Sequence, residues 1–410
     1  MSSAVLPAGE RDSEVIALVG MAHGTSHFFH MLLPPLYPWL MRDLNLTFTQ
    51  VGALMSVFFV VSGIGQALSG FVVDRFGARP VLFFGVGTLV LSGVAVALAD
   101  RYEMLLVAAA IAGLGNSVFH PADFTMLNRK VRPQRLGHAF SAHGLSGNLG
   151  WAVGPVVMVA VAQAYGWNAA GMAASCIALA VLAILLIRRD VLSDAALARP
   201  ADAARGGTPA PAASTFSFLA IPAVWLCLMF FFLSTAAFAI LQNFGPSILI
   251  ALYSLELGAA ALTISVYAIG SALGTLIGGF LAVPGKRLDF VIGTALAVSA
   301  CLALLLSSAA IPAWTVFPAI AAMGFGLGLV GPSRDLLVRQ AATDRVGKAS
   351  FGRVYGFVYS GLDVGFALSP LLIGPLLDAR QFSLALVAMA AFNALSIAAA
   401  FAVSGRRPAQ

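Results

Sequence analysis

The stretch Gly70-Phe71-Val72-Val73-Asp74-Arg75-Phe76-Gly77-Ala78-Arg79 forms a short charged break between two long apolar segments. Asp74 can accept hydrogen bonds from backbone amides at the start of a partner helix, where the helix dipole favours a negative charge. Gly70 permits close approach of a helix, and Arg75 and Arg79 hold the loop by charge. A loop that only kept positive charge on one side of a membrane would explain the arginines. It would not explain the spacing of the glycines and the aspartate, so the stretch is interpreted as a gate latch.

The composition around this loop is that of a membrane protein. The chain has 410 residues, of which 60% are apolar and 10% are charged, whereas soluble chains are about 45–50% apolar and about 25% charged. This excludes an ordinary soluble enzyme and a disordered protein. At roughly 20 apolar residues per membrane helix, the apolar content corresponds to about twelve spans. The net charge of +6 comes from basic residues scattered between apolar runs, so it does not indicate a nucleic-acid partner.

Twelve apolar segments can be placed along the chain, and one long break divides them. The break at 189–216 is rich in Ala, Pro and Gly, which is a linker composition. We therefore expect an N-terminal six-helix bundle at 1–188, a linker at 189–216 and a C-terminal six-helix bundle at 217–410. The twelve predicted segments are 14–41, 49–73, 79–98, 103–127, 136–163, 166–188, 217–246, 257–282, 288–308, 312–338, 348–376 and 381–404.

The distribution of basic residues predicts the orientation. With a cytoplasmic N-terminus, only Arg42, Arg101 and Arg380 of the 23 Lys and Arg fall on the outer side. The other basic residues fall on the inner side, as the positive-inside rule requires. This predicts a multi-pass protein with a cytoplasmic linker and both termini in the cytoplasm.

The two halves of the chain also repeat. Gly113-Leu-Gly115 in segment four corresponds to Gly324-Phe-Gly326 in segment ten, and Asn148-Leu-Gly150 in segment five corresponds to Asp363-Val-Gly365 in segment eleven. Two matches in the same order, at nearly the same offset, indicate a duplicated six-helix unit. Transporters of this build place the substrate between the halves, near the bilayer midplane.

These features resemble those of a known family. The Gly70–Arg79 loop is similar to the signature loop of the major facilitator superfamily, Gly-x-x-x-Asp-Arg-x-Gly-x-Arg/Lys, between helices two and three of a twelve-span chain. The resemblance implies an all-α membrane protein, with twelve transmembrane helices in two pseudo-symmetric six-helix bundles. It also implies transport by alternating access, in which the bundles rock about a central site.

The first half further resembles the fosmidomycin-resistance subgroup of this superfamily, whose members are proton-driven exporters of bacterial inner membranes. The similar stretches are His23-Gly-Thr-Ser-His27, Leu33-Pro-Pro-Leu-Tyr-Pro38, Ser117-Val-Phe-His120-Pro121 and Gly147-Asn148-Leu-Gly150 with Gly154-Pro155. The chain departs from the subgroup where that group carries acids, with His27 and Ala122 at those places. Asp123 follows Ala122, so the proton chemistry is expected to be rearranged.

Histidines are the main candidates for substrate or proton contacts. His23, His27 and His30 lie at i, i+4 and i+7, which places them on one face of helix one. Ionisable groups inside a membrane are expensive and usually face a polar pathway, and histidine suits a proton relay. His120 in helix four and His143 in helix five extend the set. Each imidazole could instead only pack against a neighbouring helix. Histidine is also a good ligand for zinc, nickel or copper, but no carboxylate or cysteine accompanies the histidines of helix one, so proton or substrate contact is preferred to binding of a metal or a metal chelate.

Acidic and polar residues supply the remaining candidates. Asp363 lies near the middle of helix eleven, opposite its neutral counterpart Asn148, and is a plausible reversible proton carrier. It could also form a static salt bridge or interhelix hydrogen bond. Asp123 could pair with Arg79 or Arg129 in an inner gate. The other candidate contacts are Arg334, for an anion or for a gate ion pair, and Gln242, Asn243, Tyr355 and Tyr359.

Helix five carries Gly150-x-x-x-Gly154-Pro155, which resembles the antiporter motif of drug exporters without its trailing glycine pair. Small residues at this spacing also serve ordinary helix packing. The three cysteines lie far apart in apolar runs, so no metal site is predicted from them.

The sequence therefore predicts a non-enzymatic, proton-coupled secondary transporter of the bacterial inner membrane, with protons as the coupling ion and no cofactor. Its expected partners are a small-molecule substrate and the lipid bilayer, and we expect a monomer. The favoured function is export, by antiport, of a small polar or anionic molecule or drug. The alternatives are proton-coupled import of an organic acid or of a metal chelate such as a siderophore, and a non-transporting sensor.

Overall fold

The computed structural model describes residues 8–193, 217–281, 287–346 and 351–405, apart from the side chains of 8–10, 217–218, 335–346, 351–356 and 404–405. Twelve of its helical segments are long and apolar enough to cross a membrane. Large apolar side chains such as Phe71, Ile187 and Phe280 are exposed on the outside of the molecule. An outer surface of this kind is suited to lipid rather than water, so the twelve-span membrane fold predicted from the sequence is confirmed.

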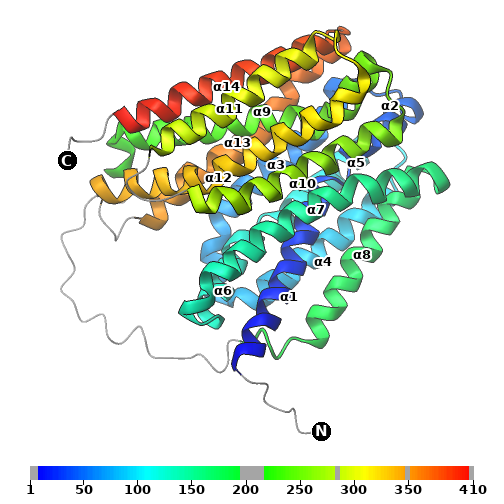
Figure 1. Ribbon diagram of the computed structural model, residues 1–410. Coiled ribbons are helices and arrows are strands. Elements are labelled where there is room, and N and C mark those ends of the chain that lie inside the picture. Colours follow the sequence, from blue (N-terminus) through cyan, green and yellow to red (C-terminus); the bar gives the residue numbers. More distant parts are fainter. Residues whose placement is uncertain (1–7, 194–216, 282–286, 347–350, 406–410) are drawn as a thin grey trace.

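The helices form two bundles that lie side by side (Figure 1). The first bundle contains α1 Ala8–His30, η1 Pro34–Leu36, α2 Tyr37–Asp43, α3 Phe48–Phe76, α4 Ala78–Ala97, α5 Tyr102–Asn116, α6 Phe119–Lys130, η2 Pro133–Arg135, α7 Leu136–Tyr165 and α8 Trp167–Ile187. The second contains η4 Ser217–Ala220, α9 Pro222–Tyr253, α10 Leu257–Leu281, α11 Leu288–Ser307, η5 Ala313–Thr315, α12 Val316–Val346, α13 Phe351–Asp378 and α14 Phe382–Gly405.

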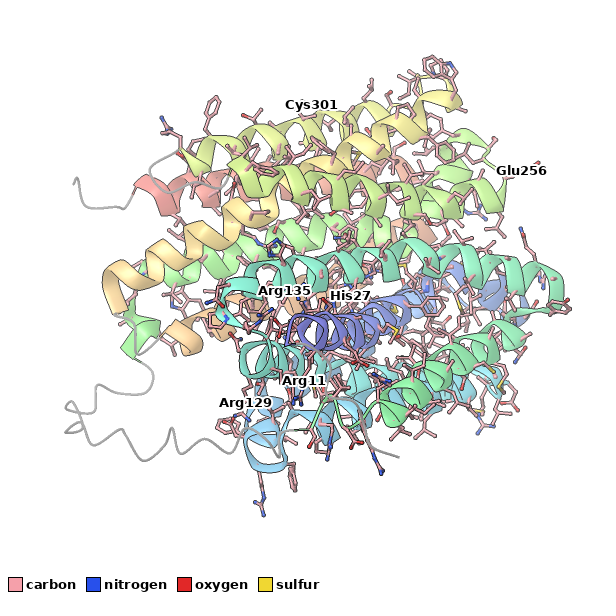
Figure 2. The ribbon with its side chains drawn as sticks, turned by 60° about the horizontal axis from the view of Figure 1, so that its bottom comes forward. Arg11, His27, Arg129, Arg135, Glu256 and Cys301 are labelled. Atoms are coloured by element: carbon pink, nitrogen blue, oxygen red, sulfur yellow. The ribbon has the colours of Figure 1, made fainter. Side chains whose placement is uncertain are left out.

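We call the end of the molecule where α1 and α9 begin and α8 and α14 finish the linker end, and the other end the opposite end. In Figure 2, Arg11, Arg129 and Arg135 lie on the linker side, Glu256 lies at the opposite end, and His27 lies between them. Arg42, Arg101 and Arg380 belong to the turns of the opposite end. The asymmetry of basic residues therefore follows the long axis of the bundles, as the sequence predicted.

Several predicted segments differ from the observed helices, and prolines mark three of the differences. The span predicted at 14–41 is interrupted after His30, before Pro34 and Pro35, so that α1 is followed by η1 and α2. The span predicted at 217–246 continues through Pro246 to Tyr253, because a membrane helix tolerates proline where neighbouring helices cover the freed backbone. The span predicted at 103–127 is broken instead between Asn116 and Phe119. Pro121 has no N–H to donate to the Ser117 carbonyl, and this carbonyl accepts a hydrogen bond of 2.9 Å from Ser69 Oγ.

The two bundles meet along two helix pairs, α3 with α13 and α7 with α10. Gly374 lies against Thr49, and Ser265 Oγ donates a hydrogen bond of 2.6 Å to the Ala152 carbonyl. Toward the linker end, a Cβ placed on Gly70 or on Gly144 would meet no atom within 4 Å. Among the described residues, the bundles are therefore in contact from the opposite end to the middle of the molecule and separate toward the linker end.

Candidate functional site

Five histidines of the first bundle gather in the middle of the molecule, and we call them the histidine cluster: His23, His27 and His30 of α1, His120 of α6 and His143 of α7. The ring centroid of His23 lies 4.4 Å from that of His27, 3.5 Å from that of His143 and 5.5 Å from that of His120. The predicted face of α1 is therefore present, and α6 and α7 add two imidazoles to it.

Glycines of α7 allow α1 to lie close enough to form this cluster. A Cβ on Gly150 would overlap the Gly24 carbonyl, and a Cβ on Gly154 would lie 2.6 Å from Met31 Cβ. A Cβ on Gly147 would lie 2.9 Å from the rings of His23 and His27. In this conformation the Gly150–Gly154–Pro155 motif thus packs α7 against α1, which was one of its two interpretations.

His30 is fixed on both sides of its ring. The Trp151 indole N–H, which can only donate, lies 3.2 Å from His30 Nδ1, so this nitrogen accepts. His30 Nε2 then donates to Asn116 Oδ1 at 3.0 Å. Asn116 in turn donates to Ser62 Oγ at 2.8 Å and accepts from Ser26 Oγ. His30 therefore belongs to a satisfied network, as its packing interpretation proposed, and has no nitrogen left for a ligand.

Asp123 does not form the ion pair with Arg79 or Arg129 that the sequence suggested. Its carboxyl group is fully buried and accepts a hydrogen bond of 3.0 Å from His143 Nε2. The first turn of α6 carries Asp123 inward, toward α7, so the linker-end arginines are out of its reach. The second carboxyl oxygen, Oδ1, is buried and has no partner among the described residues.

A hydrogen-bonded chain connects the histidine cluster to the second bundle. His120 Nδ1 donates to Gln66 Oε1 at 2.9 Å, and Gln66 Nε2 donates to Asp363 Oδ2 at 3.3 Å. Asp363 was predicted as a proton carrier or as a partner in an interhelix hydrogen bond, and the structure shows this hydrogen bond. Gly63 lies under the carboxyl group, since a Cβ there would be 3.0 Å from Asp363 Cβ. His120, Gln66 and Asp363 are all partly exposed.

An aromatic layer closes the interface on the side of the His120–Gln66–Asp363 hydrogen-bonded chain that is turned toward the opposite end. Phe59 and Phe366 stack at 4.4 Å between ring centroids, and Trp151 contacts Phe238 at 5.2 Å. The His30 ring lies against the same layer, 6.2 Å from Phe366. Toward the linker end, a Cβ on Gly70 would meet no atom within 4 Å, so among the described residues the interface is more open on that side of Gln66 and Asp363.

The other candidates of the second bundle are not members of the hydrogen-bonded chain of His120, Gln66 and Asp363, although Tyr359 lies one turn before Asp363 on α13. The Arg334 guanidinium lies over the Phe231 ring at 4.3 Å and the Tyr359 ring at 5.8 Å. The sequence offers the adjacent Asp335 or a neighbouring acid for a gate ion pair with Arg334, but the side chains of Asp335 and of the candidate Tyr355 lie outside the described residues. Asn243 is buried, donates to the Ala239 carbonyl at 2.8 Å and accepts from Tyr37.

Two predicted amides have unpaired atoms. Both amide atoms of Gln242 are buried without a partner among the described residues, and so is Asn148 Oδ1. Asn148 Nδ2 donates to the Gly144 carbonyl of its own helix at 3.2 Å. Neither residue belongs to the hydrogen-bonded chain of His120, Gln66 and Asp363 that connects the two bundles.

The Gly70–Arg79 loop is not latched to the second bundle by any described contact. Asp74 is exposed and makes no hydrogen bond or ion pair with the described residues. The close approach predicted for Gly70 is also absent, because the bundles are apart at this end. Arg79 donates to the Arg189 carbonyl within the first bundle at 3.3 Å. Gly77 has a φ of +86° between α3 and α4, a conformation that glycine adopts without strain.

Two overlapping groups in the cluster could hold a metal ion. His23, His27 and His120 form one group and His23, Asp123 and His143 the other, and in each the ligand atoms lie within 4.8 Å of one another. Proton or substrate contact was preferred to metal binding in the sequence analysis, because no carboxylate or cysteine accompanies the histidines of α1.

Three functional partners were missed by the sequence analysis: Gln66, Asn116 and Trp151. Each is a polar side chain, or carries one polar atom, inside an apolar segment, which is a usable signal in a membrane helix. Asn116 lies within the repeated Gly113-Leu-Gly115 motif and Trp151 within the helix-five motif. Both were interpreted only as parts of those motifs.

Comparisons with known proteins agree with this architecture. The family model described as "Major Facilitator Superfamily" matches residues 19–351. The chain is 25% identical to the fosmidomycin resistance protein of Escherichia coli (strain K12), over 86% of this chain and 85% of that protein. It is also 24% identical to the membrane sensor protein UhpC of the same organism, over 90% of this chain and 87% of that protein.

Solved structures show the same fold. A bacterial homologue of the human lysosomal transporter Spinster, in an inward-facing and occupied conformation, superposes with a TM-score of 0.71. The superposition covers 96% of this chain and 97% of that one, at 16% sequence identity. With the family model matched over most of its length, the chain belongs to the major facilitator superfamily, a family of transporters rather than enzymes.

Proposed function

We propose that this protein is a proton-coupled exporter, working by antiport, of a small polar or anionic molecule or drug. The observation that carries the proposal is the Gln66–Asp363 hydrogen bond of 3.3 Å between the bundles. It places an acidic group of the second bundle in direct contact with the first bundle, within the interface between them. A carboxyl group at this position can gain or lose its proton when the bundles move.

Alternating access gives this contact its role. A carrier must have two conformations that differ by only a few kcal/mol, each stabilised by contacts that the other lacks. Rocking of α3 against α13 would break the Gln66–Asp363 hydrogen bond and expose the carboxyl group to the other side. The histidine cluster would then form the wall that faces the substrate, together with Gln66.

We propose that the linker end is cytoplasmic and that the membrane is the bacterial inner membrane. The support is the concentration of Lys and Arg at the linker end. In this orientation the conformation described here faces inward. A membrane-impermeant maleimide applied to intact cells should label Trp314→Cys, whose side chain is 75% exposed at the opposite end, and miss Gly206→Cys. Labelling at position 206 would reverse the orientation.

The coupling test uses proteoliposomes that contain a trapped pH-sensitive dye. Fosmidomycin is the first probe, because the relative in Escherichia coli is named for resistance to it, followed by other small polar and anionic compounds. A transported compound should move protons in the opposite direction and accumulate uphill under an imposed pH gradient. Asp363→Asn should lose uphill accumulation but keep downhill exchange, and Asp363→Glu should keep part of it.

Asp190→Asn is the matched control, because Asp190 is an exposed acid at the linker end. Accumulation that is equal with and without the gradient, and unchanged in Asp363→Asn, would contradict proton coupling. Loss of folded protein in Asp363→Asn, with unchanged coupling per folded molecule, would assign the residue to packing.

Import of an organic acid or a metal chelate is the second candidate. It is favoured by the half-buried Arg334, whose charge could attract an anion from the interface. The same proteoliposomes discriminate import from export. A proton-coupled importer moves the compound in the same direction as the protons, whereas the proposed exporter moves it in the opposite direction. A sensor, as the similarity to UhpC allows, would bind a compound without net flux.

A further inference from the structure

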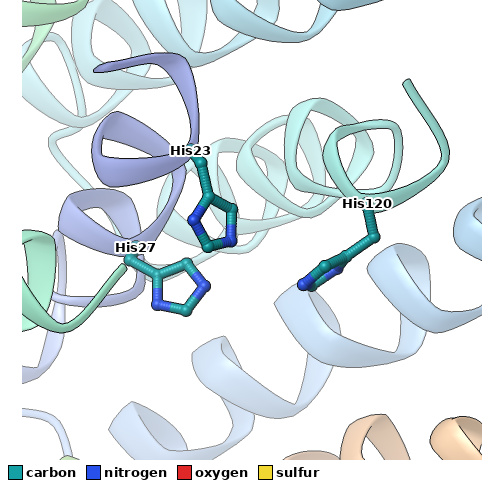
Figure 3. A group of neighbouring side chains, drawn as sticks. All are labelled: His23, His27 and His120. Carbon is teal, nitrogen blue, oxygen red and sulfur yellow. The ribbon is translucent and has the colours of Figure 1, made fainter. Parts of the chain in front are cut away.

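Three imidazoles of the histidine cluster converge on one small space. Figure 3 shows His23 and His27 from α1 and His120 from α6 pointing toward one another. One nitrogen from each lies within 4.8 Å of the other two. His30, which shares the α1 face, is not part of this group because both of its nitrogens are already used.

The hydrogen bonds behind two of these rings fix which nitrogen faces the space. His23 Nδ1 lies 2.9 Å from the His143 carbonyl, which can only accept, so Nδ1 carries the proton. His120 Nδ1 donates to Gln66 Oε1 in the same way, because the Gln66 amide nitrogen is turned toward Asp363. Nε2 of both rings is therefore left with a lone pair. A carbonyl or amide oxygen bound to the far nitrogen is the arrangement that orients metal-binding histidines.

One of the facing nitrogens is buried and has no partner. His23 Nε2 forms no hydrogen bond with the described residues, and the His23 side chain is 3% exposed. Leaving a buried acceptor unpaired is unfavourable unless a donor or a cation lies beside it. His27 Nδ1 is buried against Gly147, where a Cβ would lie 2.9 Å from it, and the other nitrogen of His27 is turned toward His120 (Figure 3). The buried, unpaired Oδ1 of Asp123 belongs to the overlapping group that shares His23, so an acidic group also lies close to the space.

We propose that His23, His27 and His120 bind a divalent transition-metal ion of the zinc, cobalt and nickel type. Three neutral imidazoles suit these ions, whereas magnesium and calcium require oxygen ligands. Three protein ligands leave at least one coordination position open, as in catalytic zinc sites. Metal–nitrogen bonds of about 2.0–2.1 Å require the three nitrogens to lie somewhat closer together than 4.8 Å. His27 and His120 are partly exposed, and His120 is hydrogen-bonded to Gln66 at the interface, so the open position can be reached from the space between the bundles.

Binding is tested on the purified full-length chain in detergent, with an affinity tag that contains no histidine. Co²⁺ is the probe, because its visible absorption reports ligand number and geometry. We expect saturation at one equivalent, and loss of the saturable absorption in His27→Ala and in His120→Ala. His138→Ala is the matched control: His138 is exposed near the start of the same α7 helix, and its removal should leave binding unchanged.

Two further variants separate direct ligation from indirect effects. His120→Cys should restore binding and add a thiolate-to-cobalt charge-transfer band, which appears only if residue 120 is a ligand. Gln66→Ala should keep the stoichiometry but weaken the affinity about 10–100-fold, the usual effect of removing the group that orients a ligand.

Several outcomes would overturn the proposal. They are no saturable binding to the native chain, unchanged binding in folded His27→Ala and His120→Ala, or loss of binding in His138→Ala. Co²⁺ binding to folded His120→Cys without the charge-transfer band would also overturn the proposal, because residue 120 would then not be a ligand of the ion. This equilibrium measurement does not depend on transport, so it stands or fails separately from the proposed export function.

Discussion

Each end of the interface between the bundles carries an aspartate at the end of a helix. One of these aspartates is hydrogen-bonded to the other bundle, and the other is not. At the opposite end, the Asp378 carboxylate at the close of α13 accepts hydrogen bonds from the first turn of α3: Phe48 N at 2.6 Å, Thr49 N at 3.0 Å and Thr49 Oγ at 2.6 Å. At the linker end, Asp74 at the close of α3 has no partner among the described residues. Both acids suit a helix N-terminus, where amides are unpaired and the dipole is positive.

The difference indicates how two conformations can be balanced in one molecule. In the conformation described here, the α3 N-terminus is capped from the other bundle by Asp378, while Asp74 is left to water. In the alternative conformation we expect the reverse, with Asp74 capping a helix of the second bundle and Asp378 released. Each latch then stabilises one state only, so that neither state dominates.

The comparison can be tested with spin-label distances across each end. Labels at Asp100→Cys and Trp314→Cys report the opposite end, where both native side chains are about three-quarters exposed (74% and 75%). Labels at Arg129→Cys and Arg287→Cys, which are also exposed, report the linker end.

The largest effect is expected from Gly374→Leu. A Cβ on Gly374 would lie 2.7 Å from Thr49 Cα, so the bundles must move apart at the opposite end. Overpacking costs about 1–3 kcal/mol, equivalent to about a 5–150-fold change in populations. The distance between positions 100 and 314 should lengthen, and the distance between 129 and 287 should shorten.

Gly279→Leu is the control for this experiment, because a Cβ there meets no atom within 4 Å and the position is exposed. Gly70→Leu should fit in the present conformation and hinder closure of the linker end, which would leave the distances unchanged or move them the other way. If Gly374→Leu gave native distances, the opposite end would not be the closed one.

Asp74→Ala should leave the protein folded and slow transport by about tenfold or more, the scale of an inter-state coupling. Its carboxylate has no partner in this conformation, so both label distances in the major population should be unchanged. Turnover in proteoliposomes is the measurement, normalised to folded protein. Native turnover would remove the mechanistic significance of the Gly70–Arg79 loop.

Asp378→Ala should shift the populations in the direction of Gly374→Leu but less far, by about fivefold. Three hydrogen bonds are lost, but they are exposed to solvent and therefore weakened. Asp378→Asn keeps one accepting oxygen and should be intermediate, and the exposed Glu103→Ala at the same end should have no effect. Equal shifts for positions 378 and 103 would mean that only net charge matters.

The smallest effect is expected from Thr47→Ala. Thr47 and Gln50 form a reciprocal capping pair at the start of α3, with distances of 3.2 Å and 2.9 Å. Losing this cap destabilises the helix by about 1 kcal/mol, and the thermal unfolding midpoint should fall slightly. Thr47→Ser should retain the native midpoint, while a fall equal to that of Thr47→Ala would exclude capping as the cause.

Particular residues show why some features were readable from the sequence. The length of each apolar run is dictated by bilayer thickness, so most spans were located to within a few residues. Pro34, Pro121 and Pro246 mark three exceptions. A proline removes one backbone donor in any sequence, but whether the helix continues or breaks depends on which neighbour satisfies the freed carbonyl.

Only part of the candidate site could be predicted from the sequence. The spacing of His23, His27 and His30 already placed them on one face, because helical periodicity is a local property. That His30 is occupied by Trp151 and Asn116, whereas His120 joins His23 and His27, depends on how α1 packs against α5, α6 and α7. No spacing along the chain contains that information.

The amino-acid sequence by itself determined the number of spans, their division into two halves and the polarity of the ends, because apolar length and charge act locally against the bilayer. It also determined the family, through the Gly70–Arg79 loop. Only the tertiary structure decided which acid is engaged, Asp378 and not Asp74, and which groups meet at the centre. Those outcomes arise from contacts between residues as far apart as Gln66 and Asp363 or Phe48 and Asp378, and they change when the two bundles move.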